Sequence, residues 1–587
     1  MTTLKPLLLT ALFLSQTVIP TNATETPSLI TGPYNMGKSG IVRYEDVYHP
    51  VVGRKGMVSS QNTQATIIGI DILKAGGNAV DSAVAVGFAL AVTLPRAGNL
   101  GGGGFMLLHS AKDDITRSID YREMAPSGVS ASDFLDKNGK RISQLSKSYS
   151  AMGVPGTVAG LHKAHKGYGS GKLSWSQLLQ PAINLAKDGF IVNYDLAQLL
   201  SAKSEWLLGH PATADAYFKK DRALYQAGDT MKLPDLAWSL EQIAKHGPDA
   251  FYNGKIAEKI VSDMEQHGGF IDRKDLSSYR PKIRQAIRGT YRGYEIVSMA
   301  PPSSGGIAII QALNILEHFP LSQWGRSAQT VHVMAEAMKL SFADRGLYLA
   351  DPDFEDVPAK WLTNKARAKK LSEKINPNQA TPSSQITGAK MVEESPSTTH
   401  FSIIDAYGNA VSNTYTLANS FGTGKVIKGT GILMNNQIYT FSVEAGTIGA
   451  SGFIASHANR LETHKRPVSS QSPTMVLKDG KPFLILGSPG GSRIINVVIQ
   501  MISNVIDHGM NIAEATNERR FHHQWLPDLL EVEPGFNLDS QKILTAKGHK
   551  VKETRSMGST QSIMVQDGFF LGASDPRRPN AKTMGLD

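Results

Sequence analysis

The chain of 587 residues contains no cysteine. Disulfide bonds, thiolate metal sites and cysteine nucleophiles are therefore excluded, and the composition suits an oxidising compartment without fixing one. Charged residues are also sparse, at 19% of the chain, and the net charge of +10 is diffuse. Because no run of Lys and Arg is interleaved with aromatic residues, we do not expect nucleic-acid binding.

Long apolar runs are missing as well, apart from one at the N-terminus. Lys5 precedes the apolar segment 7–14, and Thr21-Asn22-Ala23 offers small residues for cleavage. This pattern predicts a signal peptide over residues 1–23, because the apolar stretch is too short to span a bilayer permanently. An uncleaved membrane anchor is the alternative. We expect an exported protein, periplasmic or secreted, that has no stable membrane anchor.

The first part of the chain reads mainly as helices. Residues 56–93 are expected to form two helices, the second of them buried because it is rich in Ala, Val and Gly. The glycine run 101–104 permits close backbone approach or positive φ but lacks the spacing of a phosphate loop. Residues 150–370 are expected to be mostly helical, with a strand at 291–299.

A long polar connector, residues 371–397, separates these helices from a predicted hairpin. It contains three prolines and many Ser, Thr, Asn and Gln residues. Polar connectors of this length are uncommon inside a compact protein and usually have a function. Strands are expected at 398–405 and 410–417, joined by the turn 406–409.

The hairpin places two threonines together. If Tyr407 lies at the centre of the turn, Thr398 faces Thr416, whose hydroxyl would orient that of Thr398. An ordinary cross-strand threonine pair is the alternative. A threonine hydroxyl needs a base, and an N-terminal threonine has one in its own α-amine, with a pKa of about 7.7–8.0. This chemistry requires a cut between Ser397 and Thr398.

A second motif combines a strand, a glycine loop and a helix. The strand is expected at 483–486 and the helix at 493–506, capped by Ser492. Backbone N–H groups at a helix N-terminus stabilise anions, so Gly490 and Gly491 are candidates for an oxyanion hole. A tight strand–helix turn without a catalytic role is the alternative.

Other polar residues have two interpretations each. Arg122 is a candidate clamp for a carboxylate, but by itself a salt bridge to Glu123 or Asp120 is favoured. His400 is expected to have a packing role, because residues of a strand alternate between faces. The histidines at 522–523 lack a metal-ligand pattern and are interpreted as structural.

Together these motifs resemble the bacterial γ-glutamyltranspeptidases (glutathione hydrolase proenzymes), which are N-terminal-nucleophile hydrolases. The resemblance runs from about residue 49 to the C-terminus. It is carried by Gly76-Gly77-Asn78-Ala79-Val80-Asp81, the glycines 101–104, Arg122-Glu123-Met124-Ala125-Pro126, Pro302-Ser303-Ser304-Gly305-Gly306, Thr398-Thr399-His400, Phe421-Gly422-Thr423-Gly424, Asn435-Asn436-Gln437, Arg466-Pro467-Val468-Ser469-Ser470, residues 488–493 and Gly558-Ser559-Thr560-Gln561-Ser562.

The resemblance implies an α/β (α+β) fold, a four-layer αββα sandwich. It also implies self-cleavage between Ser397 and Thr398 into a large subunit, 24–397, and a small one, 398–587, which form a heterodimer. The reaction would transfer the γ-glutamyl group of glutathione or a related γ-glutamyl donor to water, an amino acid or a peptide. No metal or cofactor is implied.

The resemblance also assigns roles to individual residues. Thr398 would be the nucleophile and Thr416 its hydroxyl partner. The other implied roles are an oxyanion hole at Gly490 and Gly491, a site for the α-carboxylate at Arg122, Ser469 and Ser470, and a contact with the α-amino group at Gln437.

Two positions depart from the family's pattern, both on the side of the α-amino group. Thr440, a substrate-binding position, stands where the family usually has an acid, and Ala418 stands where it usually has Asn. Losing a charge-assisted partner costs about 1.5–3 kcal/mol of binding. We therefore keep a glutaryl or cephalosporin-type acylase as an alternative function. An inactive exported binding protein is an alternative of another class, and it would remain uncut.

Overall fold

The computed structural model describes residues 46–392, 394, 397–447 and 454–587. The predicted signal peptide, residues 1–23, lies outside them. Among the described helices, none is both long enough and apolar enough to cross a membrane. Residues 48–587 belong to one structural unit.

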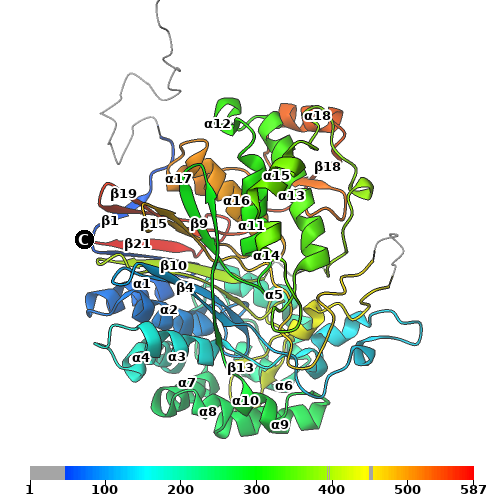
Figure 1. The fold of residues 1–587 in the computed structure, drawn as a ribbon. Coiled ribbons are helices and arrows are strands. Elements are labelled where there is room, and N and C mark those ends of the chain that lie inside the picture. Colours follow the sequence, from blue (N-terminus) through cyan, green and yellow to red (C-terminus); the bar gives the residue numbers. More distant parts are fainter. Residues whose placement is uncertain (1–45, 393, 395–396, 448–453) are drawn as a thin grey trace, which may run out of the picture. The chain divides into compact units, whose positions relative to one another are not determined.

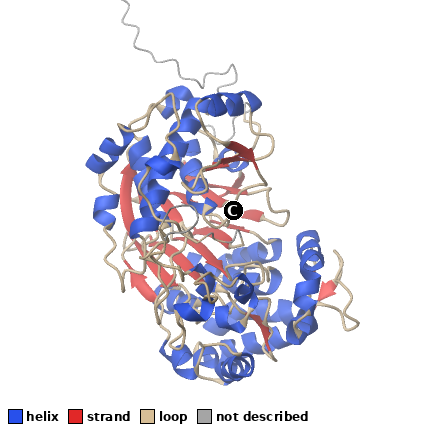
Figure 2. Ribbon diagram, turned by 90° about the vertical axis from the view of Figure 1, so that its right-hand side faces the viewer, coloured by secondary structure: helices blue, strands red, loops and turns tan. Residues whose placement is uncertain are grey.

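Two antiparallel seven-stranded sheets form the centre of this unit (Figures 1 and 2). Sheet A contains, in spatial order, β1 (Val51–Gly53), β20 (Phe569–Ser574), β19 (Gln561–Gln566), β15 (Lys481–Leu486), β14 (Thr474–Lys478), β9 (Tyr294–Ser298) and β8 (Ile287–Tyr291). Sheet B contains β21 (Lys582–Leu586), β2 (Gly56–Ser60), β10 (Thr399–Asp405), β11 (Ala410–Thr416), β3 (Gly103–Ser110), β4 (Ile115–Tyr121) and β7 (Lys282–Arg284).

The two sheets pack face to face through apolar side chains. Phe105 and Leu107 of β3 join Met475 of β14 and Ile485 of β15 in one buried cluster between the sheets. The intervening Met106 belongs instead to a second cluster on the outer face of sheet B. Because successive side chains of a strand point to opposite faces, this continuous apolar run buries both faces of β3.

Helices cover the outer face of each sheet. On sheet B lie α1 (Thr63–Lys74) and α2 (Ala79–Thr93), and α2 contacts β10 and β11. On sheet A, α11 (Gly305–Leu316) contacts β8 and β9 and packs beside α13 (Ala328–Tyr348) and α16 (Arg493–Ile506). Figure 1 shows these helices above and below the paired sheets. The predicted αββα sandwich is confirmed.

The remaining elements extend these layers. Further helices below sheet B are α3 (Thr157–Tyr168), α4 (Trp175–Asp188), α5 (Tyr194–Leu208), α6 (Pro211–Tyr217), α7 (Pro234–His246), α8 (Asp249–Tyr252), α9 (Lys255–His267) and α10 (Arg273–Ser278). The others are α12 (Leu321–Trp324), α14 (Ala359–Leu362), α15 (Lys365–Ser372), α17 (Ile512–Asn517) and α18 (Leu538–Ala546). Small sheets pair β5 (Phe190–Ile191) with β6 (Thr230–Met231), β12 (Val426–Ile427) with β13 (Ile432–Leu433), and β17 (Leu530–Val532) with both β16 (Phe521–His522) and β18 (Val551–Glu553).

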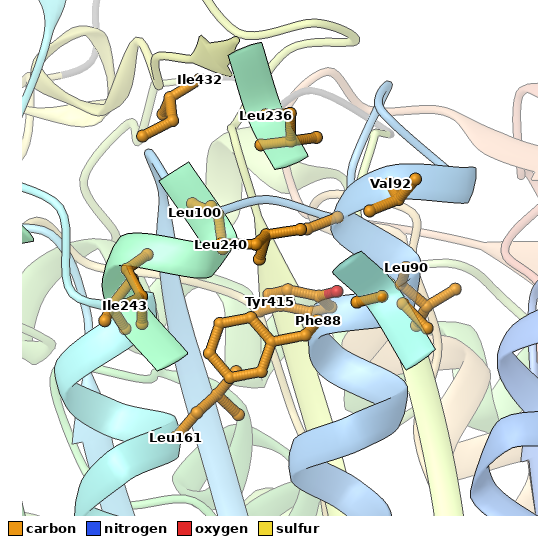
Figure 3. Close-up of a cluster of buried hydrophobic side chains, with 14 of the residues drawn as sticks. Phe88, Leu90, Val92, Leu100, Leu161, Leu236, Leu240, Ile243, Tyr415 and Ile432 are labelled. Atoms are coloured by element: carbon orange, nitrogen blue, oxygen red, sulfur yellow. The ribbon is translucent and has the colours of Figure 1, made fainter. Parts of the chain in front are cut away.

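The core below sheet B holds the hairpin of β10 and β11 in place. Figure 3 shows Tyr415 of β11 beside Phe88 of α2, within a cluster that includes Leu161 and Leu240. The Tyr415 hydroxyl donates a hydrogen bond of 2.8 Å to the carbonyl of Gly87. The hairpin is thereby joined to α2 by both apolar packing and a buried polar contact.

The sequence predictions fail at a few boundaries. Residues 56–60 form the buried strand β2 and not part of a helix, because small and apolar residues there pair with β10 and β21 on both sides. The strand predicted at 291–299 is β9, which begins only at Tyr294, because Tyr291 is the last residue of β8 and the two strands form a hairpin. Ser492 precedes α16 as predicted, but its hydroxyl bonds to Gln524 and does not cap the helix.

The N-terminus of α2 provides a test of the fold. The Asn78 side chain accepts hydrogen bonds from the N–H groups of Val80 and Asp81 and donates one to the Tyr168 carbonyl. We expect Asn78→Ala to lower the free energy of unfolding by about 1–2 kcal/mol, as for other lost N-caps. Urea denaturation of the uncut Thr398→Ala protein would measure this, with Asn78→Ser as the control that keeps a neutral cap acceptor. Equal losses in both variants would contradict the capping argument.

Candidate active site

Thr398 lies immediately before β10, in the middle of sheet B. It is buried, as are both strands of the hairpin. Pairing of Thr399 with Tyr415 and of His400 with Thr414 confirms the register predicted for the hairpin. Thr398 therefore lies opposite Thr416, the last residue of β11.

The Thr416 hydroxyl connects the two sides of the peptide bond between Ser397 and Thr398. It donates a hydrogen bond of 2.7 Å to the Ser397 carbonyl oxygen. It accepts one of 3.3 Å from the Thr398 hydroxyl and one of 3.0 Å from the backbone N–H of Ala418. The single proton and both lone pairs of this hydroxyl are thus in use, which fixes its orientation.

A small cavity of about 20 Å³ adjoins the Thr398 side chain. This volume holds about one water molecule. Most residues assigned to the site by resemblance surround it. The lining residues are Arg122, Glu394, Thr398, Thr416, Ala418, Gln437, Thr440, Ser469 and Gln471.

Arg122 lines this cavity, but its guanidinium already has several partners. It pairs with Glu123 at 3.2 Å, the salt bridge that the sequence alone favours. It also donates to the carbonyls of Pro467 and Val468, at 3.2 and 3.3 Å. Burial raises the pKa of the Glu123 carboxyl to about 7, and the neighbouring Arg122 offsets part of that rise.

The cavity lining also includes Ala418 and Thr440, the two departures from the family pattern. Gln437 and Thr440 belong to the short 3-10 helix η5 (Gln437–Thr440), where the Thr440 hydroxyl donates to the Gln437 carbonyl at 2.7 Å. Ala418 has φ of +73°, a left-handed conformation that Asn tolerates better than Ala. Neither Ala418 nor Thr440 supplies an acid to the cavity lining.

Ser469 is held by the loop that precedes α11. Ser304 donates its N–H and its hydroxyl to the Ser469 carbonyl, at 2.7 and 2.8 Å. Ser470 in turn binds the carboxylate of Glu394, which also pairs with Arg345. Glu394 and Arg345 were missed by the sequence analysis, because no local pattern separates them from other charged residues of the connector and of α13.

Gly490 and Gly491 are not among the residues that line this cavity, although both lie in the described part of the chain. Their φ values of +141° and +61° form a tight turn between β15 and α16. Their predicted role as an oxyanion hole stays a prediction.

His400 shares a face with Thr398, since the two are two residues apart, so the alternation argument used for it was wrong. Its ring nitrogens bond to the hydroxyls of Thr414 and Ser402, at 2.8 and 3.0 Å. Burial lowers its pKa to about 3. A neutral histidine with both nitrogens occupied has a structural role. His522 is also buried, with its pKa lowered to about 3 by burial.

One buried group in the described chain has the spacing of metal ligands: His332, Glu336 and His549. The two histidines hydrogen-bond to each other at 2.8 Å. The Lys339 ammonium lies 2.5 Å from the Glu336 carboxylate. Because this cation neutralises the acid and would repel a metal ion, the group is a closed polar network.

A four-layer αββα sandwich with a threonine at the start of a central strand is the arrangement of the N-terminal-nucleophile hydrolases. The family model for γ-glutamyltranspeptidase matches residues 65–585. The chain therefore belongs to the γ-glutamyltranspeptidase family.

Individual relatives agree with this membership. The chain is 52% identical over 545 residues to the glutathione hydrolase proenzyme of Escherichia coli K12, a match that covers 92% of this chain and 93% of that protein. The crystal structure of a cephalosporin acylase from Bacillus halodurans superposes with a TM-score of 0.83 at 27% identity, covering 93% and 98% of the two chains. A Helicobacter pylori γ-glutamyltranspeptidase chain superposes with a TM-score of 0.55 at 43% identity, covering 59% and 97%.

The Thr416 hydroxyl can be tested separately from Thr398. Thr416→Val keeps the β-branched shape but removes the hydrogen bond to the Ser397 carbonyl. We expect the cut to slow by about 10²–10³-fold, as when one hydrogen-bond donor to a developing oxyanion is removed. A time course on denaturing gels would measure it, with Thr416→Ser as the control that keeps the hydroxyl. A Thr416→Val precursor that is cut at the wild-type rate would contradict this role.

Proposed function

We propose that the protein cuts itself between Ser397 and Thr398 and then acts as a γ-glutamyltransferase and glutathione hydrolase. The observation that carries the proposal is the Thr416 hydroxyl, which binds both the Thr398 hydroxyl and the Ser397 carbonyl oxygen. Family membership and the likeness to a glutathione hydrolase proenzyme support the same reaction.

The cut follows from this geometry. The Thr398 hydroxyl attacks the Ser397 carbonyl carbon, while Thr416 stabilises the charge that develops on the carbonyl oxygen. Collapse breaks the C–N bond and gives an ester between Ser397 and the Thr398 oxygen. The proton lost by the hydroxyl goes to the Thr398 nitrogen, which becomes a free amine. Water then hydrolyses the ester and releases the Ser397 carboxylate. The products are a large subunit, 24–397 after export, and a small subunit, 398–587.

The Thr398 hydroxyl is also the nucleophile of the second reaction, the transfer of the γ-glutamyl group. The Thr398 α-amine, with a pKa of about 7.7–8.0 when unperturbed, takes the hydroxyl proton near neutral pH. The oxygen attacks the γ-glutamyl carbonyl, the amine product leaves with that proton, and an acyl-enzyme remains. Water or the amino group of an amino acid or peptide resolves it. Gly490 and Gly491 are assigned to the oxyanion.

Binding of the γ-glutamyl donor is assigned to the two sides of the cavity. Arg122, Ser469 and Ser470 take the α-carboxylate, and Gln437 contacts the α-amino group beside Thr440. We further propose that the N-terminal segment directs export to the periplasm or the medium.

An acylase for glutaryl or cephalosporin-type amides is the second candidate. It is favoured by one observation, the lack of an acid at Ala418 and Thr440 beside the cavity. Against it, identity is 52% to the glutathione hydrolase proenzyme and 27% to the cephalosporin acylase. We therefore place γ-glutamyl transfer first.

The cut and the reaction share one nucleophile, which can be tested directly. N-terminal sequencing of the small fragment should begin Thr-Thr-His-Phe. Thr398→Ala should remain one band on a denaturing gel and show no release of p-nitroaniline from γ-glutamyl-p-nitroanilide. Thr398→Ser, which keeps a hydroxyl and an α-amine, is the control and should still be cut. A wild-type protein that stays uncut would support the inactive binding protein instead.

The donor preference tests the role of Ala418. Asn tolerates the left-handed conformation and adds an amide beside the cavity, so we expect Ala418→Asn to be no less stable than wild type. We also expect it to raise the ratio of kcat/KM for γ-glutamyl over glutaryl p-nitroanilide by about tenfold, the effect of roughly one added hydrogen bond. Ala418→Gly, which relieves the backbone without adding an amide, is the matched control. An equal ratio in the Asn and Gly variants would sink this assignment.

A further inference from the structure

A buried carboxylate joins the two parts of the site assigned to the donor's α-carboxylate. Asp120 lies in β4 and is fully buried. One of its carboxylate oxygens accepts a hydrogen bond of 2.9 Å from the backbone N–H of Arg122. The other lies 2.6 Å from a guanidinium nitrogen of Arg466. Because Asp120 and Arg122 precede the proposed cut and Arg466 follows it, the pair of Asp120 and Arg466 connects the two subunits.

Arg466 is held firmly and is the first residue of the segment 466–470, which forms part of this site. Its side chain is 2% exposed. Besides its contact with Asp120, the guanidinium donates to the carbonyl oxygen of Arg280 at 2.7 Å. Its backbone N–H donates to the carboxylate of Asp351 at 2.9 Å. The position of the segment therefore follows that of Arg466.

Arg122 is connected to the same segment by its own side chain. Its guanidinium donates to the carbonyl oxygens of Pro467 and Val468, at 3.2 and 3.3 Å. Asp120 binds the main chain of Arg122 at one end of this arrangement and the segment 466–470 at the other. The relative position of the guanidinium and the segment is thus determined through Asp120 as well as through the direct contacts.

The geometry of this pair of elements matters for binding a carboxylate. Arg122 and Ser469 line the cavity beside Thr398, whereas Asp120 and Arg466 are not among its lining residues. Recognition of a carboxylate by a guanidinium depends on the directions of its hydrogen bonds. A displacement of about 1 Å in such a site can cost about 10²-fold in rate. Asp120 is thus placed to act on a bound donor through its neighbours and not by direct contact.

We propose that Asp120 is a positioning residue for the donor's α-carboxylate: it holds Arg122 of the large subunit and the segment 466–470 of the small subunit in register. This proposal rests on the proposed function, because it names a residue that supports binding of that donor. The hydrogen bonds around the bond to be cut involve Thr416 and not Asp120. A change at Asp120 therefore affects donor binding and leaves the cut unchanged.

Asp120→Asn tests the proposal with a minimal change in shape. The amide oxygen can still accept from Arg122, but the amide NH₂ then faces the guanidinium of Arg466, and two donors cannot pair. We expect kcat/KM for γ-glutamyl-p-nitroanilide to fall about 10- to 100-fold through KM. We expect kcat and the rate of the cut to stay within about threefold of wild type.

Asp353→Asn is the matched control. Asp353 pairs at 2.7 Å with Arg284, the other guanidinium that contacts Asp120. It belongs to the same group of charges but is 35% exposed, so the same substitution there should leave KM within about twofold of wild type.

A double-mutant cycle tests whether Asp120 acts through Arg122. Substitutions that act on one shared interaction are not additive. We expect Asp120→Asn to lower kcat/KM by less than about threefold when Arg122 is already replaced by Gln, with rates measured at high enzyme concentration. An equal fall in kcat/KM in both backgrounds would overturn the proposal.

The outcomes separate this proposal from the function on which it rests. A wild-type protein that is cut but does not cleave γ-glutamyl-p-nitroanilide would contradict γ-glutamyl transfer itself, and the proposal with it. If the wild type works, an Asp120→Asn enzyme with unchanged KM, or one that loses kcat instead, would overturn the proposal alone.

A second variant covers the case in which Asp120→Asn is not cut. Arg466→Lys keeps a positive charge beside Asp120 but loses the fork that also reaches the Arg280 carbonyl. A normal cut with KM raised at least threefold would support the proposal. An unchanged KM, or a failure of this variant to be cut as well, would show that the pair serves only the fold and would overturn it.

Discussion

The arrangement of the site depends on one hydroxyl group, that of Thr416. Its three hydrogen bonds hold the Thr398 hydroxyl, the Ser397 carbonyl and the backbone at Ala418 in one relative orientation. A hydroxyl has one proton, so donating it to the carbonyl leaves only lone pairs for the Thr398 side chain. The direction of the network is thereby determined: Thr398 must donate its proton towards Thr416, which leaves its own lone pairs free for attack.

This network needs a hairpin whose register cannot slip. Apolar side chains on both faces of sheet B oppose any shift, because a slip by one residue would exchange the two faces of every strand. The neighbouring strand β3 adds a steric constraint, since a Cβ at Gly104 would lie 2.4 Å from the Thr414 carbonyl oxygen. Gly102 and Gly104 are therefore explained by the close approach of this segment to β11.

The sequence predicted the hairpin of β10 and β11 and the helix α16 well, and the reason is physical. The hairpin register follows from local turn geometry, and α16 follows from an apolar pattern over residues 493–506, so neither needs knowledge of distant contacts. The strand at 56–60 was missed because its identity comes from pairing with β10 and β21, which lie far away in the chain. The contacts of Glu394 were missed for the same reason, because its partners Arg345 and Ser470 are brought to it only by the fold.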